Sequence, residues 1–197
     1  MVKNILVFVT KLLLIGAITP SLAQQENPKV LLSTSAGDII VELYPDQAPI
    51  TTENFLKYVD RDLSSSASFY RVVTMENQPN NDIKIEVIQG GLNLLDSTLS
   101  FGPIAHETTE KTELEHGHGT LSMARNKPGT ATSAFFICIN NQPTLDYGGL
   151  RNPDGQGFSA FGQVIKGMEV VLTIQQLPAN NQLLQQPVRI LAAKRIN

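Results

Sequence analysis

Two polar residues in largely apolar segments could do chemistry in this sequence. Arg71 follows the aromatic pair Phe69 and Tyr70, and Gln89 ends a segment in which apolar and polar residues alternate. A guanidinium is charged at every accessible pH and offers a rigid fork of N–H donors. Arg71 could therefore stabilise a lone pair or charge that develops during a reaction. The alternative for an isolated arginine is a surface position on the rim of a sheet.

A second segment contains groups that could bind a metal through imidazole and carboxylate: His106, Glu113, Glu115, His116 and His118. The alternative is a polar loop that leads into the next strand, and we expect no metal site. Serine, histidine and aspartate are all present, but the Gly-x-Ser-x-Gly segment of many serine hydrolases does not occur in the sequence.

Composition limits the class of protein. The chain has 197 residues, of which 42% are hydrophobic and 17% charged, enough for one substantial core but short for two domains. A formal net charge of -3 gives no electrostatic reason to expect nucleic acid as a partner. The single cysteine, Cys138, cannot form a disulfide within the chain, and its apolar neighbours predict a buried thiol.

The first residues have the pattern of a secretory signal peptide. Lys3 precedes an apolar run over 12–18, and Ser21-Leu22-Ala23 places small residues at the two critical positions of a cleavage site. The alternative is a membrane anchor, but Lys11 interrupts the apolar stretch, which is then shorter than the roughly 20 residues that a span needs. We expect residues 1–23 to be removed.

The remaining chain is then predicted to be an exported domain. Cleavage removes two of the 15 basic residues, which leaves 13 against 18 acidic residues and a net charge of -5. We expect a short linker over 24–29, a single domain over 30–197, and no stable membrane insertion after cleavage. The expected location is the periplasm, with secretion as the second choice, and nothing requires more than a monomer.

The mature chain is predicted to be mostly β. Alternating apolar residues on both sides of a turn at 35–38 predict an opening hairpin, with Gly37 at positive φ. Thr51 is the expected N-cap of a helix that presents Phe55 four residues later, and a second helix is expected to start at Gly167. Further strands are expected at 69–73, 82–89, 120–124, 134–139 and 188–194, with loops at 75–81 and 179–186.

Five of these segments resemble, in order, those of cyclophilin-type peptidyl-prolyl isomerases: Phe69-Tyr70-Arg71-Val72-Val73, Ile88-Gln89-Gly90-Gly91, 119–124, 133–138 and 161–168. The resemblance extends over about 30–194, almost the whole predicted mature chain. It implies a mainly β fold, a closed antiparallel eight-stranded barrel capped by two helices.

The resemblance also implies an activity that needs no cofactor. Rotation about an X-Pro bond is slow because it breaks amide conjugation, and its activation energy is about 20 kcal/mol. A catalyst needs no nucleophile, metal or redox group, because it only has to bind the twisted amide more tightly than the planar one. The twisted prolyl nitrogen recovers a lone pair, which a cationic donor beside an apolar proline pocket would stabilise.

By resemblance, Arg71 is the catalytic donor, and Gln89 orients the substrate carbonyl and the arginine. Phe136 and Leu145 match the residues that line the proline pocket. On the alternative interpretation, Phe135 and Phe136 are only alternating core residues of one strand.

Four further residues are assigned to substrate binding by the same resemblance. Val87 stands where the family commonly has methionine, and Phe158 stands where it has a pocket histidine. Ala124 and Arg125 match the segment that pairs with the bound peptide through its backbone.

Three further positions depart from the family pattern. Glu86 replaces a phenylalanine three residues before Gln89, Ala134 replaces a glutamine, and Thr144 replaces a tryptophan that is common in eukaryotic members. We expect a working site that is slower or differs in selectivity from other members of the family, and we expect Ala134 and Thr144 to weaken the binding of cyclosporin-like inhibitors. The function implied is isomerisation of X-Pro bonds in proline-containing exported polypeptides, and the alternative is a non-catalytic proline-peptide-binding or chaperone module on the same barrel.

Overall fold

The computed structural model describes residues 26–61, 66–92 and 100–196. The predicted signal peptide and the first two residues of the predicted linker lie outside the described residues. Strands dominate the chain: β1 (Lys29–Thr34), β2 (Gly37–Leu43), β3 (Ala67–Val73), β4 (Val87–Leu92), β5 (Thr120–Met123), β6 (Phe135–Cys138), β7 (Ser159–Lys166), β8 (Ala179–Asn180) and β9 (Leu183–Ile196).

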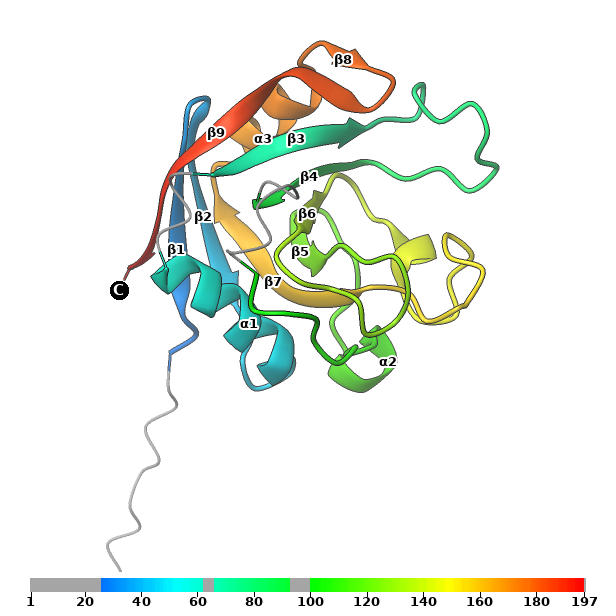
Figure 1. Ribbon diagram of the computed structural model, residues 1–197. Coiled ribbons are helices and arrows are strands. Elements are labelled where there is room, and N and C mark those ends of the chain that lie inside the picture. The colour runs from blue at the N-terminus through cyan, green and yellow to red at the C-terminus, as the bar shows by residue number, and fades with distance from the viewer. Residues whose placement is uncertain (1–25, 62–65, 93–99, 197) are drawn as a thin grey trace, which may run out of the picture.

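The helices are fewer and shorter: α1 (Pro49–Asp60), α2 (Thr109–Thr112), the single 3₁₀ turn η3 (Pro143–Leu145) and α3 (Met168–Gln175). Of these, α1 and α3 are the two expected from the sequence, and they lie at different ends of the barrel (Figure 1). None of the helices in the described ranges is long and apolar enough to cross a bilayer.

The strands form a closed antiparallel barrel. Neighbouring strands follow the order β1-β2-β7-β5-β6-β4-β3-β9, and β9 pairs back onto β1, so that eight strands complete the ring. The short β8 pairs only with β9 and lies outside the ring. The predicted fold class is confirmed. In the closing pair, Lys29 stands opposite Ile196, so the first and last strands are neighbours.

Alternating side chains fill the barrel. Val30 and Leu32 of β1 face Val41 and Ile39 of β2, and all four are buried. The turn between these strands has Gly37 at φ 132°, as expected for the hairpin.

Aromatic rings connect α1 to this core. Phe55 packs edge-on against Phe135 of β6, with ring centroids 5.3 Å apart, and also contacts Phe161 of β7 at 5.2 Å. Phe69 of β3 packs edge-on against the same Phe135. These contacts fix α1 over one mouth of the barrel.

The start of α1 differs from the prediction. The helix begins at Pro49, two residues before the expected N-cap Thr51, because proline is well suited to the first turn of a helix. The cap is supplied by a distant residue, Glu107. Its carboxylate accepts hydrogen bonds from the backbone N–H groups of Ile50 (3.2 Å) and Thr51 (2.8 Å) and from the Thr51 hydroxyl (2.6 Å).

The strand predicted over 82–89 is shorter than its alternating pattern indicates. It begins only at Val87, because side chains occupy the backbone groups that a strand partner would use. Gln78 donates to the Ile85 carbonyl (2.8 Å) and accepts from the Ile85 N–H (3.3 Å), and Arg151 donates to the Ile83 carbonyl. Residues 82–85 therefore lie outside the sheet, and Glu86 makes one backbone contact with the end of the neighbouring strand, because its carbonyl accepts from the Ile139 N–H (2.9 Å).

The prediction of a loop over 179–186 is also wrong, because most of these residues belong to strands. They form the β8–β9 hairpin, and β9 begins at Leu183 instead of Val188. Asn181 occupies the turn at φ 58°, a left-handed conformation that asparagine tolerates well. The other predicted strands appear within one or two residues of their expected bounds.

The long-range cap of α1 leads to a stability prediction. Replacing Glu107 by alanine should lower the free energy of unfolding by about 1–2 kcal/mol, because two helix N–H groups and the buried Thr51 hydroxyl lose their acceptor. Chemical denaturation of the purified protein measures the change. Glu76→Ala is the matched control, since Glu76 is exposed in a loop. Equal stability of the two variants would contradict the capping role.

Candidate active site

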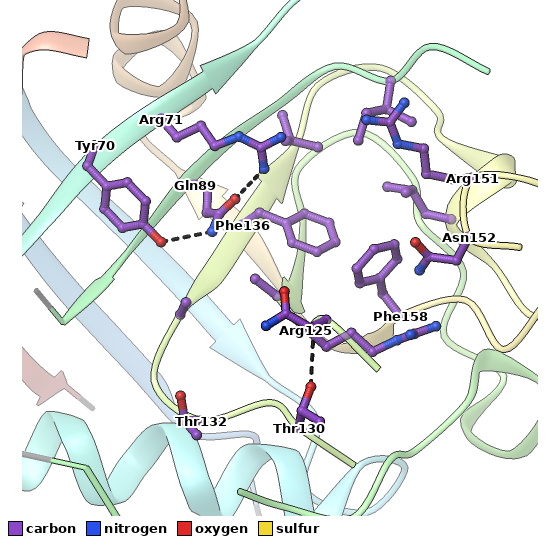
Figure 2. Close-up of a pocket in the computed structure, with 16 residues that line it drawn as sticks. Tyr70, Arg71, Gln89, Arg125, Thr130, Thr132, Phe136, Arg151, Asn152 and Phe158 are labelled. Carbon is purple, nitrogen blue, oxygen red and sulfur yellow. Dashed lines mark hydrogen bonds between the residues drawn. The ribbon is translucent and has the colours of Figure 1, made fainter. Parts of the chain in front are cut away.

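The residues predicted from the sequence lie around one cleft of about 340 Å³ on the outside of the barrel (Figure 2). All eight line it, and they come from strands β3, β4 and β6, the end of β5, the turn η3 and the segment before β7: Arg71, Val87, Gln89, Ala124, Arg125, Phe136, Leu145 and Phe158. Tyr70, Ile85, Ala134, Arg151 and four further polar residues complete the lining.

Strand register brings the central residues into a row. Arg71 of β3 stands opposite Gln89 of β4, Gln89 stands opposite Phe136 of β6, and Phe136 stands opposite Ser122 of β5. Directly opposed residues in antiparallel strands have neighbouring side chains on the same face. The donor, the orienting amide and the pocket ring are thus adjacent because of the sheet itself.

A bulge in β3 is needed to bring Arg71 into this row. Phe69 pairs with Gly90, and Arg71 pairs with Gln89, so Tyr70 is an extra residue against β4. The pairing with β9 is also irregular at this point, where Phe69 stands opposite Val188 and Arg71 opposite Leu183. In a regular strand, Arg71 would share the inward face of Phe69, which is fully buried in the barrel. The bulge turns Arg71 outward, as bulges near functional sites commonly do.

Two glutamines hold the Arg71 guanidinium. Its Nη1 donates to Gln89 Oε1 (2.6 Å), and its Nε and Nη2 both donate to Gln182 Oε1 (3.0 and 2.6 Å). Gln89 in turn donates from Nε2 to the Tyr70 hydroxyl (2.8 Å). Figure 2 shows this chain of contacts from Tyr70 through Gln89 to Arg71.

Gln182 is a site residue that the sequence analysis missed. It lies in the β8–β9 turn, which was predicted to be a solvated loop. Its backbone carbonyl accepts from the Val72 N–H (2.8 Å), and its side-chain Nε2 donates to the Asn77 carbonyl (3.2 Å), so its position is fixed on both sides. The signal in the sequence was Asn181-Gln182, because an asparagine in the left-handed region can close a hairpin.

The surroundings of Arg71 leave its charge available. Burial lowers the pKa of Arg71, and burial also raises the pKa of Tyr70. An arginine pKa begins so high that the group stays protonated at physiological pH. Because its two hydrogen-bond partners are neutral amides, the guanidinium is oriented without being neutralised.

An apolar floor lies beside this donor. Val87, Phe136 and Leu145 are buried and pack together with Ile85. Phe158 forms one side of this hollow, and its ring lies edge-on to that of Phe136, with the ring centroids 5.3 Å apart. Figure 2 shows Phe136 and Phe158 facing the open space of the cleft. Such a hollow suits a proline ring.

The substitution at Glu86 does not place a charge in this hollow. The Glu86 carboxylate accepts a hydrogen bond from Asn140 Nδ2 (2.9 Å), away from the cleft lining, and Ile85 supplies the wall. Ala134 does line the cleft, so its small side chain widens the groove where the family commonly has glutamine.

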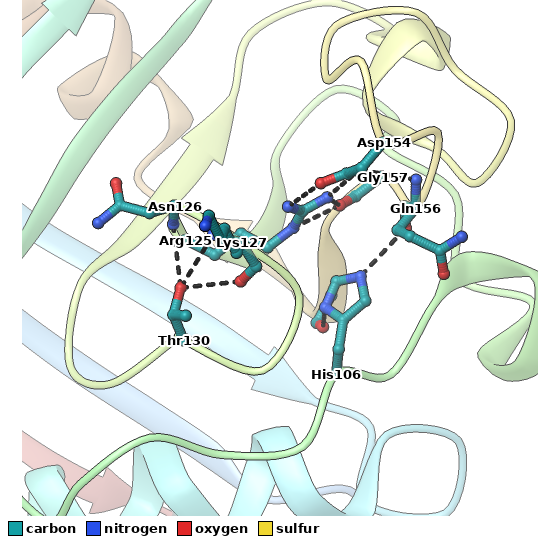
Figure 3. Close-up of polar contacts among 9 residues, drawn as sticks. His106, Arg125, Asn126, Lys127, Thr130, Asp154, Gln156 and Gly157 are labelled. Carbon is teal, nitrogen blue, oxygen red and sulfur yellow. Dashed lines mark hydrogen bonds and ion pairs between the residues drawn. The ribbon is translucent and has the colours of Figure 1, made fainter.

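Arg125 has a role beyond the predicted backbone pairing. Its Nη1 and Nη2 contact both carboxylate oxygens of Asp154 (2.7 and 2.9 Å), and its Nε donates to the Gly157 carbonyl (2.8 Å) (Figure 3). The guanidinium also lies over the Phe158 ring, 5.1 Å from its centroid. The Arg125 hydrogen bonds lower the pKa of Asp154 to about 2. Arg125 thus clamps the loop that carries Phe158.

A buried Ser-His-Asp arrangement lies directly behind Phe136. His116 Nδ1 is 2.6 Å from Asp146 Oδ1, and its Nε2 is 2.9 Å from Ser122 Oγ. These are the contacts of a hydrolase triad, but Ser122 is 0% exposed and His116 is 1% exposed, so no substrate reaches the hydroxyl. The imidazole instead stacks on the Phe136 ring, with the ring centroids 6.0 Å apart and an angle of 15° between the ring planes. The network supports the pocket floor.

The metal alternative has no geometric support among the described residues, where no cluster of three or more suitable ligands occurs. Each histidine makes different contacts: His106 bonds with the Gln156 carbonyl and with Ser159, and His118 Nδ1 accepts from the Asn140 N–H. Cys138 is buried as expected, and burial raises the pKa of its thiol.

Comparison with known proteins agrees with this geometry. The family model described as cyclophilin type peptidyl-prolyl cis-trans isomerase/CLD matches residues 29–195. The chain belongs to this family. It is 32% identical to peptidyl-prolyl cis-trans isomerase A of Dickeya dadantii, over 92% of this chain and 88% of that protein. Peptidyl-prolyl cis-trans isomerase B of Escherichia coli is 30% identical, over 81% of this chain and 91% of that protein.

A solved cyclophilin has the same fold. The crystal structure of a Cryptosporidium parvum cyclophilin type peptidyl-prolyl cis-trans isomerase aligns with a TM-score of 0.63 and 25% identity, over 87% of this chain and 98% of that one. The expected family is therefore confirmed. As a member of this family, the chain is a peptidyl-prolyl cis-trans isomerase.

The position of Gln182 in this cyclophilin leads to a kinetic prediction. Gln182→Leu should lower kcat/KM for an X-Pro peptide by about 5- to 20-fold, mainly through kcat, because Arg71 loses two hydrogen bonds that orient it. Protease-coupled or NMR exchange kinetics measure the effect. Gln186→Leu, at an exposed position of the adjoining strand β9, is the control. A Gln182 variant with unchanged kcat would show that Gln89 alone is sufficient to orient Arg71.

Proposed function

We propose that this protein is exported and accelerates rotation about X-Pro bonds in proline-containing polypeptides that fold outside the cytoplasm. The observation that carries the catalytic role is the Arg71 guanidinium, held with its charge intact at the edge of an apolar hollow. The observation that supports export is the signal-peptide pattern over residues 1–23. The periplasm is the proposed location, with secretion as the second choice.

In the proposed mechanism, the proline ring enters the hollow formed by Val87, Phe136, Leu145 and Phe158. As the amide twists, the prolyl nitrogen recovers its lone pair and can accept a hydrogen bond. Arg71 donates that bond, and because the planar amide nitrogen has no free lone pair, the twisted state gains more than the ground state. The bond to Gln89 keeps the guanidinium in place during rotation.

The backbone of the bound peptide has a natural place beside this hollow. Ala124 and Arg125 follow β5 directly at the cleft edge, where an extended peptide could add to the sheet. The protein is proposed to act as a monomer, since the described part of one chain supplies the donor, the orienting amides and the hollow.

A non-catalytic binding module on the same barrel would bind the same peptides, but it would not need an oriented cation. The two glutamine contacts of Arg71 therefore favour catalysis. Arg71→Ala should lower kcat/KM for an Ala-Pro peptide by about 100-fold, because one transition-state donor is removed. Its thermal unfolding temperature should stay close to that of the wild type, and Arg189→Ala, at an exposed site on β9, should retain full activity.

If folded wild-type protein failed to accelerate the exchange, or if Arg71→Ala retained full activity, the binding-module alternative would be favoured. Peptide binding, measured by NMR titration in the same samples, separates loss of catalysis from loss of the groove.

Export is tested on the full chain expressed in a bacterium that has a periplasm. The mature protein should be recovered from the periplasmic fraction with Gln24 as its first residue, because the expected cleavage follows Ala23. Intact mass spectrometry of the fractionated protein measures this. A matched chain that lacks residues 2–23 should remain in the cytoplasmic fraction. Recovery of the uncleaved full chain from the cytoplasm would contradict the proposal.

A further inference from the structure

Arginine is the only charged residue type in the described lining of the cleft. Arg71, Arg125 and Arg151 all contribute to that lining, and no aspartate or glutamate does. The mature chain as a whole carries an excess of acidic residues, so this concentration of positive charge opposes the overall balance. A cleft lined by charge of one sign attracts ligands of the other sign.

The three arginines differ in how their charge is compensated. Arg125 is paired with both carboxylate oxygens of Asp154, and its side chain is 1% exposed. Arg71 contacts only the amides of Gln89 and Gln182. Arg151 donates from Nη1 to the backbone carbonyl of Ile83, which also carries no formal charge. Arg71 and Arg151 therefore face the cleft as cations without a carboxylate partner among the described residues.

These two guanidinium groups are close enough to influence each other. Burial and the positive charge of Arg71 both lower the pKa of Arg151. Like charges that are partly removed from water are unfavourable unless an anion joins them. A carboxylate placed between or beside them would relieve this repulsion when the substrate binds.

The position of Arg151 relative to the proline hollow is fixed by its loop. Its backbone N–H donates to the Thr144 carbonyl (3.1 Å), next to the pocket residue Leu145. Farther along, Arg125 holds the same loop through Asp154 and Gly157 (Figure 3). Figure 2 shows Arg151 on the side of the cleft opposite Tyr70, across the hollow from Gln89. A residue adjacent to a bound proline would lie within reach of its side chain.

We propose that Arg151 forms a subsite for a side-chain carboxylate next to the substrate proline, so that the enzyme favours X-Pro segments flanked by Asp or Glu. A guanidinium binds a carboxylate through two parallel hydrogen bonds, and Nη1 of Arg151 is already oriented by Ile83. This inference rests on the proposed function, because it concerns the substrates of the same cleft. It assigns Arg151 to specificity and leaves the rotation itself to Arg71.

The test uses peptides with blocked ends, so that a side chain is their only source of a carboxylate. NMR exchange kinetics compare Glu, Gln and Lys at the position before proline and, in a second set, at the position after it. At low salt, the wild type should show kcat/KM about 3- to 10-fold higher for Glu than for Gln in at least one set, and lowest for Lys. This preference should shrink as the salt concentration rises to roughly 1 M.

Variants then assign the preference to Arg151. In Arg151→Gln, the Glu-to-Gln ratio should fall to about one, and Arg151→Lys should restore part of it because the charge remains. Arg189→Gln removes the same charge from an exposed site on β9 and should keep the wild-type ratio. Thermal unfolding of each variant identifies any change that comes from losing the Ile83 contact.

A wild-type Glu-to-Gln ratio near one in both peptide sets would overturn the subsite, and so would a preference that Arg151→Gln leaves unchanged. Failure of the proposed catalytic function has a different signature, since no peptide would then be turned over. In that case, NMR titration of the Glu and Gln peptides against wild type and Arg151→Gln still decides whether the carboxylate is recognised.

Discussion

One extra residue in β3 determines whether this barrel can have a catalytic arginine. Without the bulge at Tyr70, Arg71 would point with Phe69 into an interior filled by aromatic and aliphatic side chains. A guanidinium there would be buried without a partner, which is among the most costly arrangements in a protein. With the bulge, Tyr70 and Arg71 both face outward, and the Tyr70 hydroxyl becomes the far anchor of Gln89. The local irregularity thus provides both the donor and its support.

The choice of partners for Arg71 follows from its task. A carboxylate would orient the guanidinium equally well, but it would cancel the charge that a twisted amide nitrogen has to meet. Amide oxygens orient it and leave the charge available, at the cost of partial desolvation that appears as the lowered pKa. The contrast with Arg125 is direct, since that guanidinium is neutralised by Asp154 and serves as a clamp. Two arginines of the same cleft therefore have different functions because their partners differ in charge.

Sequence reasoning found the barrel and most of the site because both depend on short-range patterns. Alternation along β6 separates Phe135, which packs inside the barrel, from Phe136, which lines the cleft. Two errors arose where side chains took the place of backbone partners. Gln78 and Arg151 bond with the backbone of Ile85 and Ile83, which stay outside the sheet, and Glu107 caps a helix more than fifty positions earlier in the chain. No local pattern encodes such contacts, and Gln182 was missed because its turn is formed by an asparagine rather than a glycine.

The pairing of β1 with β9 has a consequence for how the chain is made. Lys29, at the start of β1, lies opposite Ile196, at the end of β9, so the ring of strands remains open until β9 has left the ribosome. Contacts between such distant segments form late and only after a large loop has closed. Until then, β1 and β3, the two strands that flank β9, each keep an unpaired edge. The topology that closes the domain therefore also delays completion of the barrel until the last strand is available.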